Sequence, residues 1–173
     1  MRSLVAGTSR AAQVDQQTVK VMPECKPGMT ALMLAAQHGH TSCVRELLHY
    51  GARGDLTDQD GTTPLMFASR NGHLQAVRAL FDEQGSQTDP NQAKPTGMTS
   101  LMFAAKNGFP DVVHELLSRG ADAHRVNSRT GRTALDEARI NAHAAVADTL
   151  VHHGAPSGEG TPQRARTSVV MYL

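Results

Sequence analysis

The chain has 173 residues, with 17 basic and 16 acidic side chains and a formal net charge of +1. That balance excludes the concentrated basic surface that nucleic acids and anionic membranes attract, so neither is expected as a partner. Aromatic residues make up only 3% of the chain and tryptophan is absent, which leaves leucine, alanine, valine and methionine to build the core. This composition favours closely packed helices. No apolar run approaches the roughly 20 residues needed to cross a bilayer, so we expect a soluble protein.

Residues 1–27 open with a basic, small-residue stretch that contains no acid before Asp15. Three interpretations stay open for this segment. It faintly resembles a mitochondrial transit peptide, it suits a solvated arm, and its residues 14–22 suit a helix that covers the end of the domain. Pro23 and Pro27 then end any helix and lead in extended form to Gly28.

A twelve-residue phrase organises the rest of the chain. Residues 97–108 read Gly-Met-Thr-Ser-Leu-Met-Phe-Ala-Ala-Lys-Asn-Gly, and related phrases begin at Gly28, Gly61 and, in a decayed form, Gly131. The opening glycines are therefore separated by 33, 36 and 34 residues. An internal repeat of this length predicts stacked units, because one unit cannot bury its apolar face alone.

Each copy predicts two helices. In the first copy, Thr30 is expected to cap a short helix that Gly39 ends, and a second helix begins near Thr41. The residues expected to face inward are Leu32, Leu34, Ala35, Ala36, Cys43, Val44, Leu47 and Leu48, then Leu65, Phe67, Ala68, Val77, Leu80 and Phe81, then Leu101, Phe103, Ala104, Val112, Val113, Leu116 and Leu117, and finally Leu135, Ala138, Val146, Leu150 and Val151.

The period near 33, with Gly-x-Thr-x-Leu, then Ala-Ala, Gly-His, Leu-Leu and Gly-Ala, resembles the ankyrin repeat. The resemblance implies an all-α ankyrin-repeat solenoid of stacked helix-turn-helix units with projecting hairpin loops. We expect an N-terminal arm or cap at 1–27, four repeats at 28–60, 61–96, 97–130 and 131–155, and a C-terminal tail at 156–173.

Two departures from the family pattern stand out. Where family members commonly carry histidine after Thr-Pro-Leu, this chain has Met33, Met66, Met102 and Asp136, which predicts softer apolar packing in place of hydrogen bonds. In the second copy, the second helix is expected to extend to Gly85, and the longer segment 86–96 carries turn signals that would push it outward. The longer loop is either a tolerated variation in loop length or part of the edge that binds a partner.

No catalytic constellation is present in the sequence. His40, His73 and His143 follow the helix-ending glycine or its replacement, where the resemblance implies a structural role. His114-Glu115 begins like a zinc-protease motif, but Ser118 replaces the second histidine. We therefore expect no enzyme activity, no catalytic residue, no cofactor and no metal. Cys25 and Cys43 are not expected to form a disulfide, and we expect the protein in the cytoplasm, the nucleus or both.

The resemblance implies that a partner protein binds along the hairpin tips and the exposed side of the first helices. The candidate contact residues are Met29, Gln37, His38, Asp60, Thr62, Arg70, Asn71, Thr96, Met98, Lys106, Asn107, Thr130, Arg132, Ile140 and Asn141. Arg70, Lys106 and Arg132 form a basic row, which suggests an acidic segment of the partner, unless these are merely solvated charges.

Three functional classes follow from this surface. The first is a small adaptor or accessory subunit, monomeric by itself. The second is an inhibitor that occludes an enzyme, as four-repeat kinase inhibitors do, and the remote third is an enzyme. The apolar end of the tail, residues 169–173, suits docking on the last repeat, disorder, or capture by a partner.

Overall fold

The computed structural model describes residues 28–83 and 86–155. Within these ranges the chain forms eight helices in four pairs, joined by turns and loops. Their bounds are α2 (Ala31–Gln37), α3 (Thr41–His49), α4 (Pro64–Arg70), α5 (Leu74–Asp82), α6 (Ser100–Asn107), α7 (Pro110–Ser118), α8 (Ala134–Ile140) and α9 (Ala144–His152). The interpretations offered for residues 1–27 and 156–173 lie outside the described residues.

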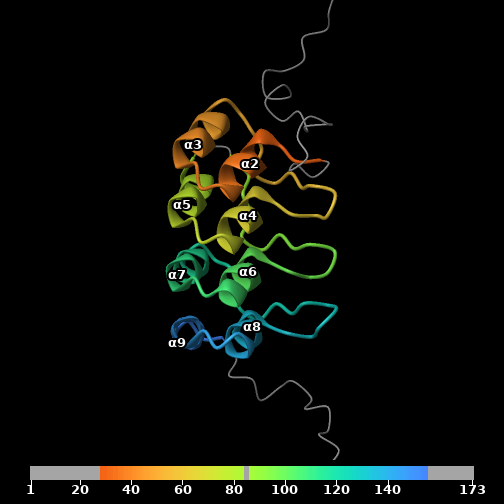
Figure 1. Ribbon diagram of the computed structural model, residues 1–173, viewed down its shortest axis with the longest axis vertical. Helices are drawn as coiled ribbons and strands as arrows, with labels where there is room; N and C mark the ends of the chain where they lie inside the picture. The colour runs from red at the N-terminus through yellow and green to blue at the C-terminus, as the bar shows by residue number, and fades with distance from the viewer. Residues whose placement is uncertain (1–27, 84–85, 156–173) are drawn as a thin grey trace, which may run out of the picture.

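The helices stack in two columns (Figure 1). The inner helices α2, α4, α6 and α8 pack on one another in sequence order, and the outer helices α3, α5, α7 and α9 do the same. Long loops between successive pairs project to one side of the inner column. The expectation of an all-α repeat solenoid is therefore confirmed.

A threonine N-cap precedes each inner helix, as predicted for the first copy. The side chains of Thr30, Thr63, Thr99 and Thr133 each accept a hydrogen bond from the backbone N–H three residues later. An N-cap of this kind satisfies a donor that the helix itself leaves unpaired. The repeated phrase therefore starts each inner helix by the same local interaction.

The methionines that replace the family's histidine lie fully inside the stack. Met33, Met66 and Met102 are each at most 1% exposed. The Met33 sulfur also accepts the Thr30 backbone N–H at 3.5 Å, a weak form of the reciprocal cap. In the last unit, the Asp136 carboxylate accepts both the N–H and the hydroxyl of Thr133 at 2.9 Å. At this position the last copy thus has a carboxylate that bonds to the N-cap threonine, where the other copies have a buried methionine.

The glycines that end three inner helices are also contact points between units. A Cβ atom at Gly39 would lie 2.6 Å from the His73 ring, one at Gly72 would lie 2.5 Å from Phe109, and one at Gly108 would lie 2.6 Å from His143. All three glycines have positive φ. Glycine is required here for both reasons, its backbone conformation and the ring that the following unit places against it.

Two residues expected in the core are instead exposed, and both lie at an end of the described stack. Cys43 on α3 is exposed, and Val151 on α9 is 46% exposed. The prediction was wrong for both because no described unit covers them, whereas their equivalents in the middle units belong to the core or pack against it. Core membership depends on the position in the stack as well as on the helical pattern.

The longer connection of the second copy also differs from expectation. Helix α5 ends at Asp82 and has nine residues like the other outer helices, so the extra residues follow the helix. The loop is tied to both neighbours: the Gln92 side chain donates to the Asp55 carbonyl at 3.0 Å, and the Asn91 side chain donates to the Gly120 carbonyl at 2.9 Å. The loop of the second unit therefore contacts both the first and the third unit.

Candidate protein-binding surface

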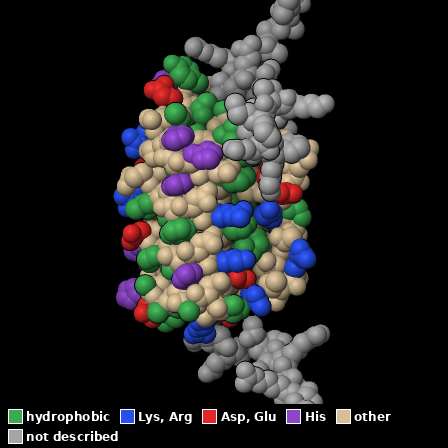
Figure 2. Space-filling model, viewed as in Figure 1, with side chains coloured by type: hydrophobic (Ala, Val, Ile, Leu, Met, Phe, Trp, Pro, Cys, Tyr) green, Lys and Arg blue, Asp and Glu red, His purple; other side chains and the backbone are tan. Residues whose placement is uncertain are grey.

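Two basic side chains lie on successive inner helices. Arg70 is the last residue of α4, and Lys106 lies in the last turn of α6; both are exposed. Among the described residues, neither makes an ion pair. Figure 2 shows lysine and arginine side chains gathered over α4, α6 and α8, beside a column of histidines. We call Arg70 and Lys106 the basic pair.

The asparagines next to the basic pair connect one unit to the preceding one. The Asn71 amide donates to the Gln37 carbonyl at 2.8 Å, and the Asn107 amide donates to the Arg70 carbonyl at 2.9 Å. His73 Nε2 also lies 3.1 Å from the Gln37 carbonyl oxygen. These bonds satisfy carbonyls at helix C-termini. Asn71 and Asn107 therefore have a structural role that sequence reasoning did not assign to them.

The last unit continues the basic surface in a different way. Arg132 Nη1 lies 3.9 Å from the buried carboxylate of Glu137, so its charge is partly engaged within the unit. Arg139, which the sequence analysis did not select, is exposed on α8. It occupies the position of the buried residues Ala36, Ser69 and Ala105 in the other copies. An arginine where the other copies have a small residue is the sequence signal that could have identified Arg139.

Two predicted contact residues are buried. Met29 is 1% exposed and packs with Met33 and Phe67, and Thr62 is 6% exposed. The Thr62 hydroxyl accepts a hydrogen bond from Lys94 Nζ at 3.1 Å. Neither side chain is accessible to a partner in this structure, so the prediction was wrong for these two positions. The loop geometry turns these two side chains inward.

The other predicted residues reach the surface to different degrees. Met98 packs partly against the core, and Gln37 and Thr96 are half-buried. Phe103, expected inside, is also half-buried on α6 and adds apolar area close to Lys106. The remaining predicted residues are exposed: His38, Asp60, Thr130, Ile140 and Asn141.

The loop tips are held by short side-chain bonds to the backbone. The Asp58 carboxylate accepts the N–H of Thr62 at 2.7 Å, and the Asn127 side chain accepts the N–H of Arg129 at 2.9 Å. The Ser128 N–H donates to the Thr96 carbonyl at 3.0 Å, which joins two successive loops. The loops therefore present a defined edge next to the basic pair.

A separate ion network joins two outer helices. The Glu115 carboxylate, whose side chain is 10% exposed, accepts from Arg78 at 2.8 Å and from Arg119 at 2.9 Å, and Arg119 also reaches Asp82 at 2.7 Å. Burial raises the pKa of Glu115, but its hydrogen bonds to Arg78 and Arg119 outweigh burial and hold the pKa below its ordinary value. This network links α5 to α7 and its C-cap Arg119, and so joins the second and third units.

The described residues contain no group of three or more histidine, cysteine or acidic side chains placed to hold a metal ion. His114 Nδ1 and His153 Nε2 lie 3.1 Å apart on the outer face, but they form only a pair. No helix within the described ranges is long and apolar enough to cross a membrane.

A family model described as ankyrin repeats (3 copies) matches residues 8–92 and 84–158. The chain belongs to the ankyrin-repeat family. No curated protein matches the chain. Ankyrin repeats are in general protein–protein interaction modules, which agrees with a stack whose described residues offer an exposed edge and basic side chains. The described residues form four helix pairs, whereas the family model is described with three copies.

Proposed function

We propose that this ankyrin-repeat protein is a non-catalytic interaction module, a small adaptor or accessory subunit that holds an acidic segment of another protein. The segment lies along the inner helices α4, α6 and α8 and the loop edge beside them. The proposal places the protein in the cytoplasm, the nucleus or both, monomeric until it meets its partner.

One observation carries the proposal: Arg70 and Lys106 are exposed on adjacent inner helices, and neither is neutralised by an acidic side chain of the described residues. The ion pairs that join Arg78 and Arg119 to Glu115 and Asp82 lie at the outer helices, away from this surface. Unpaired charges of one sign on a rigid surface steer an oppositely charged partner and favour its binding. Arg139 on α8 and Arg132, which precedes this helix, extend the basic character to the last unit.

Apolar side chains lie close enough to supply the rest of the contact. Met98 and Phe103 are half-buried, and Ile140 is 57% exposed. Methionine adapts its shape to different partners, and aromatic side chains are frequent anchors in interfaces. The basic residues steer the segment, and these three side chains hold it.

Charge reversal tests this surface. R70E and K106E, singly and together, are compared with R45E, which makes the same charge change on the exposed outer helix α3. Partners captured by the wild-type chain are identified by mass spectrometry, and the affinity of a purified partner is measured at two salt concentrations. We expect each inner variant to weaken binding about fivefold or more and to reduce its salt dependence. Equal affinity and salt dependence in R70E/K106E and R45E would overturn the proposal.

The alternative function is an inhibitor that occludes an enzyme. An inhibitor needs only the repeat stack, whereas an adaptor needs a second contact, for which the tail at 156–173 is available. Deleting the tail separates the two. An adaptor is expected to lose one of two partners, and an unchanged partner set with retained inhibition of a captured enzyme would favour the inhibitor.

A further inference from the structure

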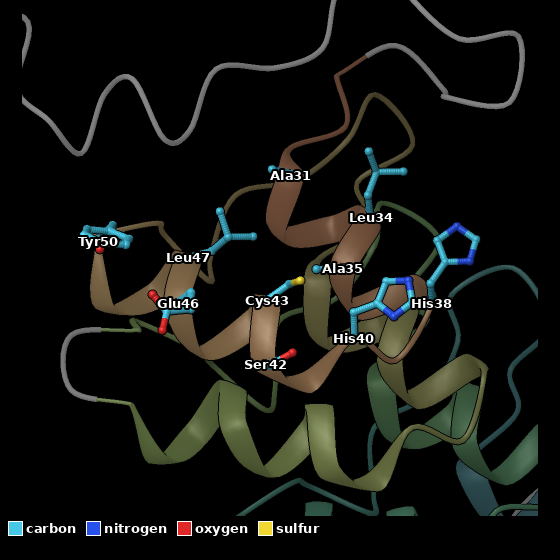
Figure 3. A pocket seen from close by; sticks show the side chains of 10 residues that line it. All are labelled: Ala31, Leu34, Ala35, His38, His40, Ser42, Cys43, Glu46, Leu47 and Tyr50. Carbon is cyan, nitrogen blue, oxygen red and sulfur yellow. The ribbon is translucent and has the colours of Figure 1, made fainter.

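An open apolar groove lies on the first unit, on the side that faces away from α4 and α5 (Figure 3). Its volume is about 670 Å³, and both helices of the unit contribute to it. Ala31, Leu34 and Ala35 come from α2, and Cys43 and Leu47 come from α3. This surface is separate from the basic pair, and the proposed function does not use it.

Every equivalent surface in the other units is covered by the preceding unit. The position of Cys43 is occupied there by Ala76, Val112 and Val146, and the position of Leu47 by Leu80, Leu116 and Leu150; all six are at most 1% exposed. Ala31 is exposed, whereas its equivalents Pro64, Ser100 and Ala134 are buried. The first unit therefore presents a stacking surface of the same design without a described unit on it.

His40 gives the same indication. Its equivalents His73 and His143 place Nε2 at 3.1 and 3.0 Å from a carbonyl oxygen of the preceding unit, Gln37 and Lys106 respectively. Their rings also cover a glycine of that unit. The His40 ring forms no hydrogen bond within the described residues. His40 therefore occupies the position from which its equivalents contact the preceding unit.

The last unit of a second copy of this chain cannot stack on the first unit in the way that successive units of one chain stack. The glycine of the stacking contact is replaced in the last unit by Ala142, which has φ +60°. In the other units, a Cβ at this position would lie 2.5–2.6 Å from the ring that stacks on it, closer than such atoms approach. The Cβ of Ala142 would therefore clash with the ring of His40 of another copy, which excludes regular head-to-tail stacking.

The ankyrin-family match begins at residue 8, so the family pattern continues for 20 residues before Gly28. That length is short of the 33-residue interval between the first two copies, which leaves room for part of a unit. The segment 8–22 carries Ala11, Val14, Val19, Val21 and Met22. We propose that residues 8–22 dock as a partial unit in the groove of the first unit and cover Ala31, Cys43 and Leu47.

Cys43 is a reporter at the base of this contact. The full chain with C25S keeps Cys43 as its single thiol, and its rate of reaction with a maleimide is measured before and after V14D/M22D is added. Q13D/Q17D is the matched control, because it adds the same charge at polar positions of the same segment. We expect Cys43 to react at least tenfold faster with V14D/M22D than in the C25S chain or the control. Equal rates in all three chains would overturn the proposal.

Hydrogen exchange of the unaltered chain gives a readout that needs no variant. The amides of residues 11–22 should exchange at least tenfold more slowly than the intrinsic rate of an unstructured peptide. Exchange at the intrinsic rate would contradict docking. Both measurements are repeated over a hundredfold range of protein concentration with light scattering. Protection that is lost on dilution as a dimer dissociates would assign the groove to a second copy and overturn the proposal.

Discussion

The imidazole of His143 packs directly on Gly108 of the preceding ankyrin unit, where a Cβ atom would lie 2.6 Å from the ring, and its Nε2 lies 3.0 Å from the Lys106 carbonyl oxygen. Gly108 also has φ +78°. The C-terminal end of α6 and the N-terminal end of α9, in the following unit, are therefore joined by contact and by hydrogen bonding.

We predict that G108A destabilises the protein by about 3 kcal/mol, because alanine is strained at positive φ and its Cβ displaces His143. G120A is the matched control: Gly120 has φ +85°, but a Cβ there would meet nothing within 4 Å. The control should lose only about 1–2 kcal/mol, the strain alone. Chemical denaturation measures both, and equal losses would show that the ring contact contributes nothing.

A142G is predicted to stabilise the protein by about 0.5–1 kcal/mol. Alanine at φ +60° is strained, and glycine relieves this strain although it loses more entropy on folding. A145G, at an exposed position within α9, should instead destabilise by about 1 kcal/mol. Thermal unfolding of the two variants should therefore shift in opposite directions, and a lower melting temperature for A142G would contradict the assignment.

N107A is predicted to lower the free energy of unfolding by about 0.5–1 kcal/mol, because it removes the bond to the Arg70 carbonyl. Q75A, at an exposed position of α5 without a described side-chain hydrogen bond, should change stability by less than about 0.5 kcal/mol. Chemical denaturation compares the two. An unchanged stability in N107A, with weaker partner binding, would return Asn107 to the role that the sequence predicted for it.

E115Q is predicted to destabilise the protein by about 2 kcal/mol at pH 7, because it removes the charge that Arg78 and Arg119 share. The folded-state pKa of Glu115 lies below its ordinary value. Its contribution is therefore complete above the ordinary glutamate pKa, about 4.3, and is lost as the pH falls through the lowered folded pKa. The difference between wild type and E115Q should shrink from pH 6 towards pH 3. The exposed residue Asp148 supplies the control D148N, and a pH-independent difference for E115Q would contradict the assignment.

Much of the fold follows from local sequence. The threonine caps, the positive-φ glycines and the leucine positions recur in each copy. They recur because each unit must start, end and bury a short helix. The family resemblance rests on these residues. The surface was predicted less well, because exposure depends on loop geometry. Met29 and Thr62, which the resemblance placed on the binding surface, turn inward.

The sequence by itself determined the repeat and the pair of helices in each unit, because these depend on residues close together in the chain. It did not determine every boundary, since α5 ends at Asp82 and not at Gly85. Tertiary structure decided what the same position does in different units. Cys43 and Val112 occupy one repeat position, yet only Val112 has a described unit stacked on it. Likewise, the sequence places Asn107 on the surface, where it is exposed, but only the structure shows that its amide bonds to the Arg70 carbonyl 37 positions away. Contacts between units join residues far apart in the chain, and only the stacked structure brings them together.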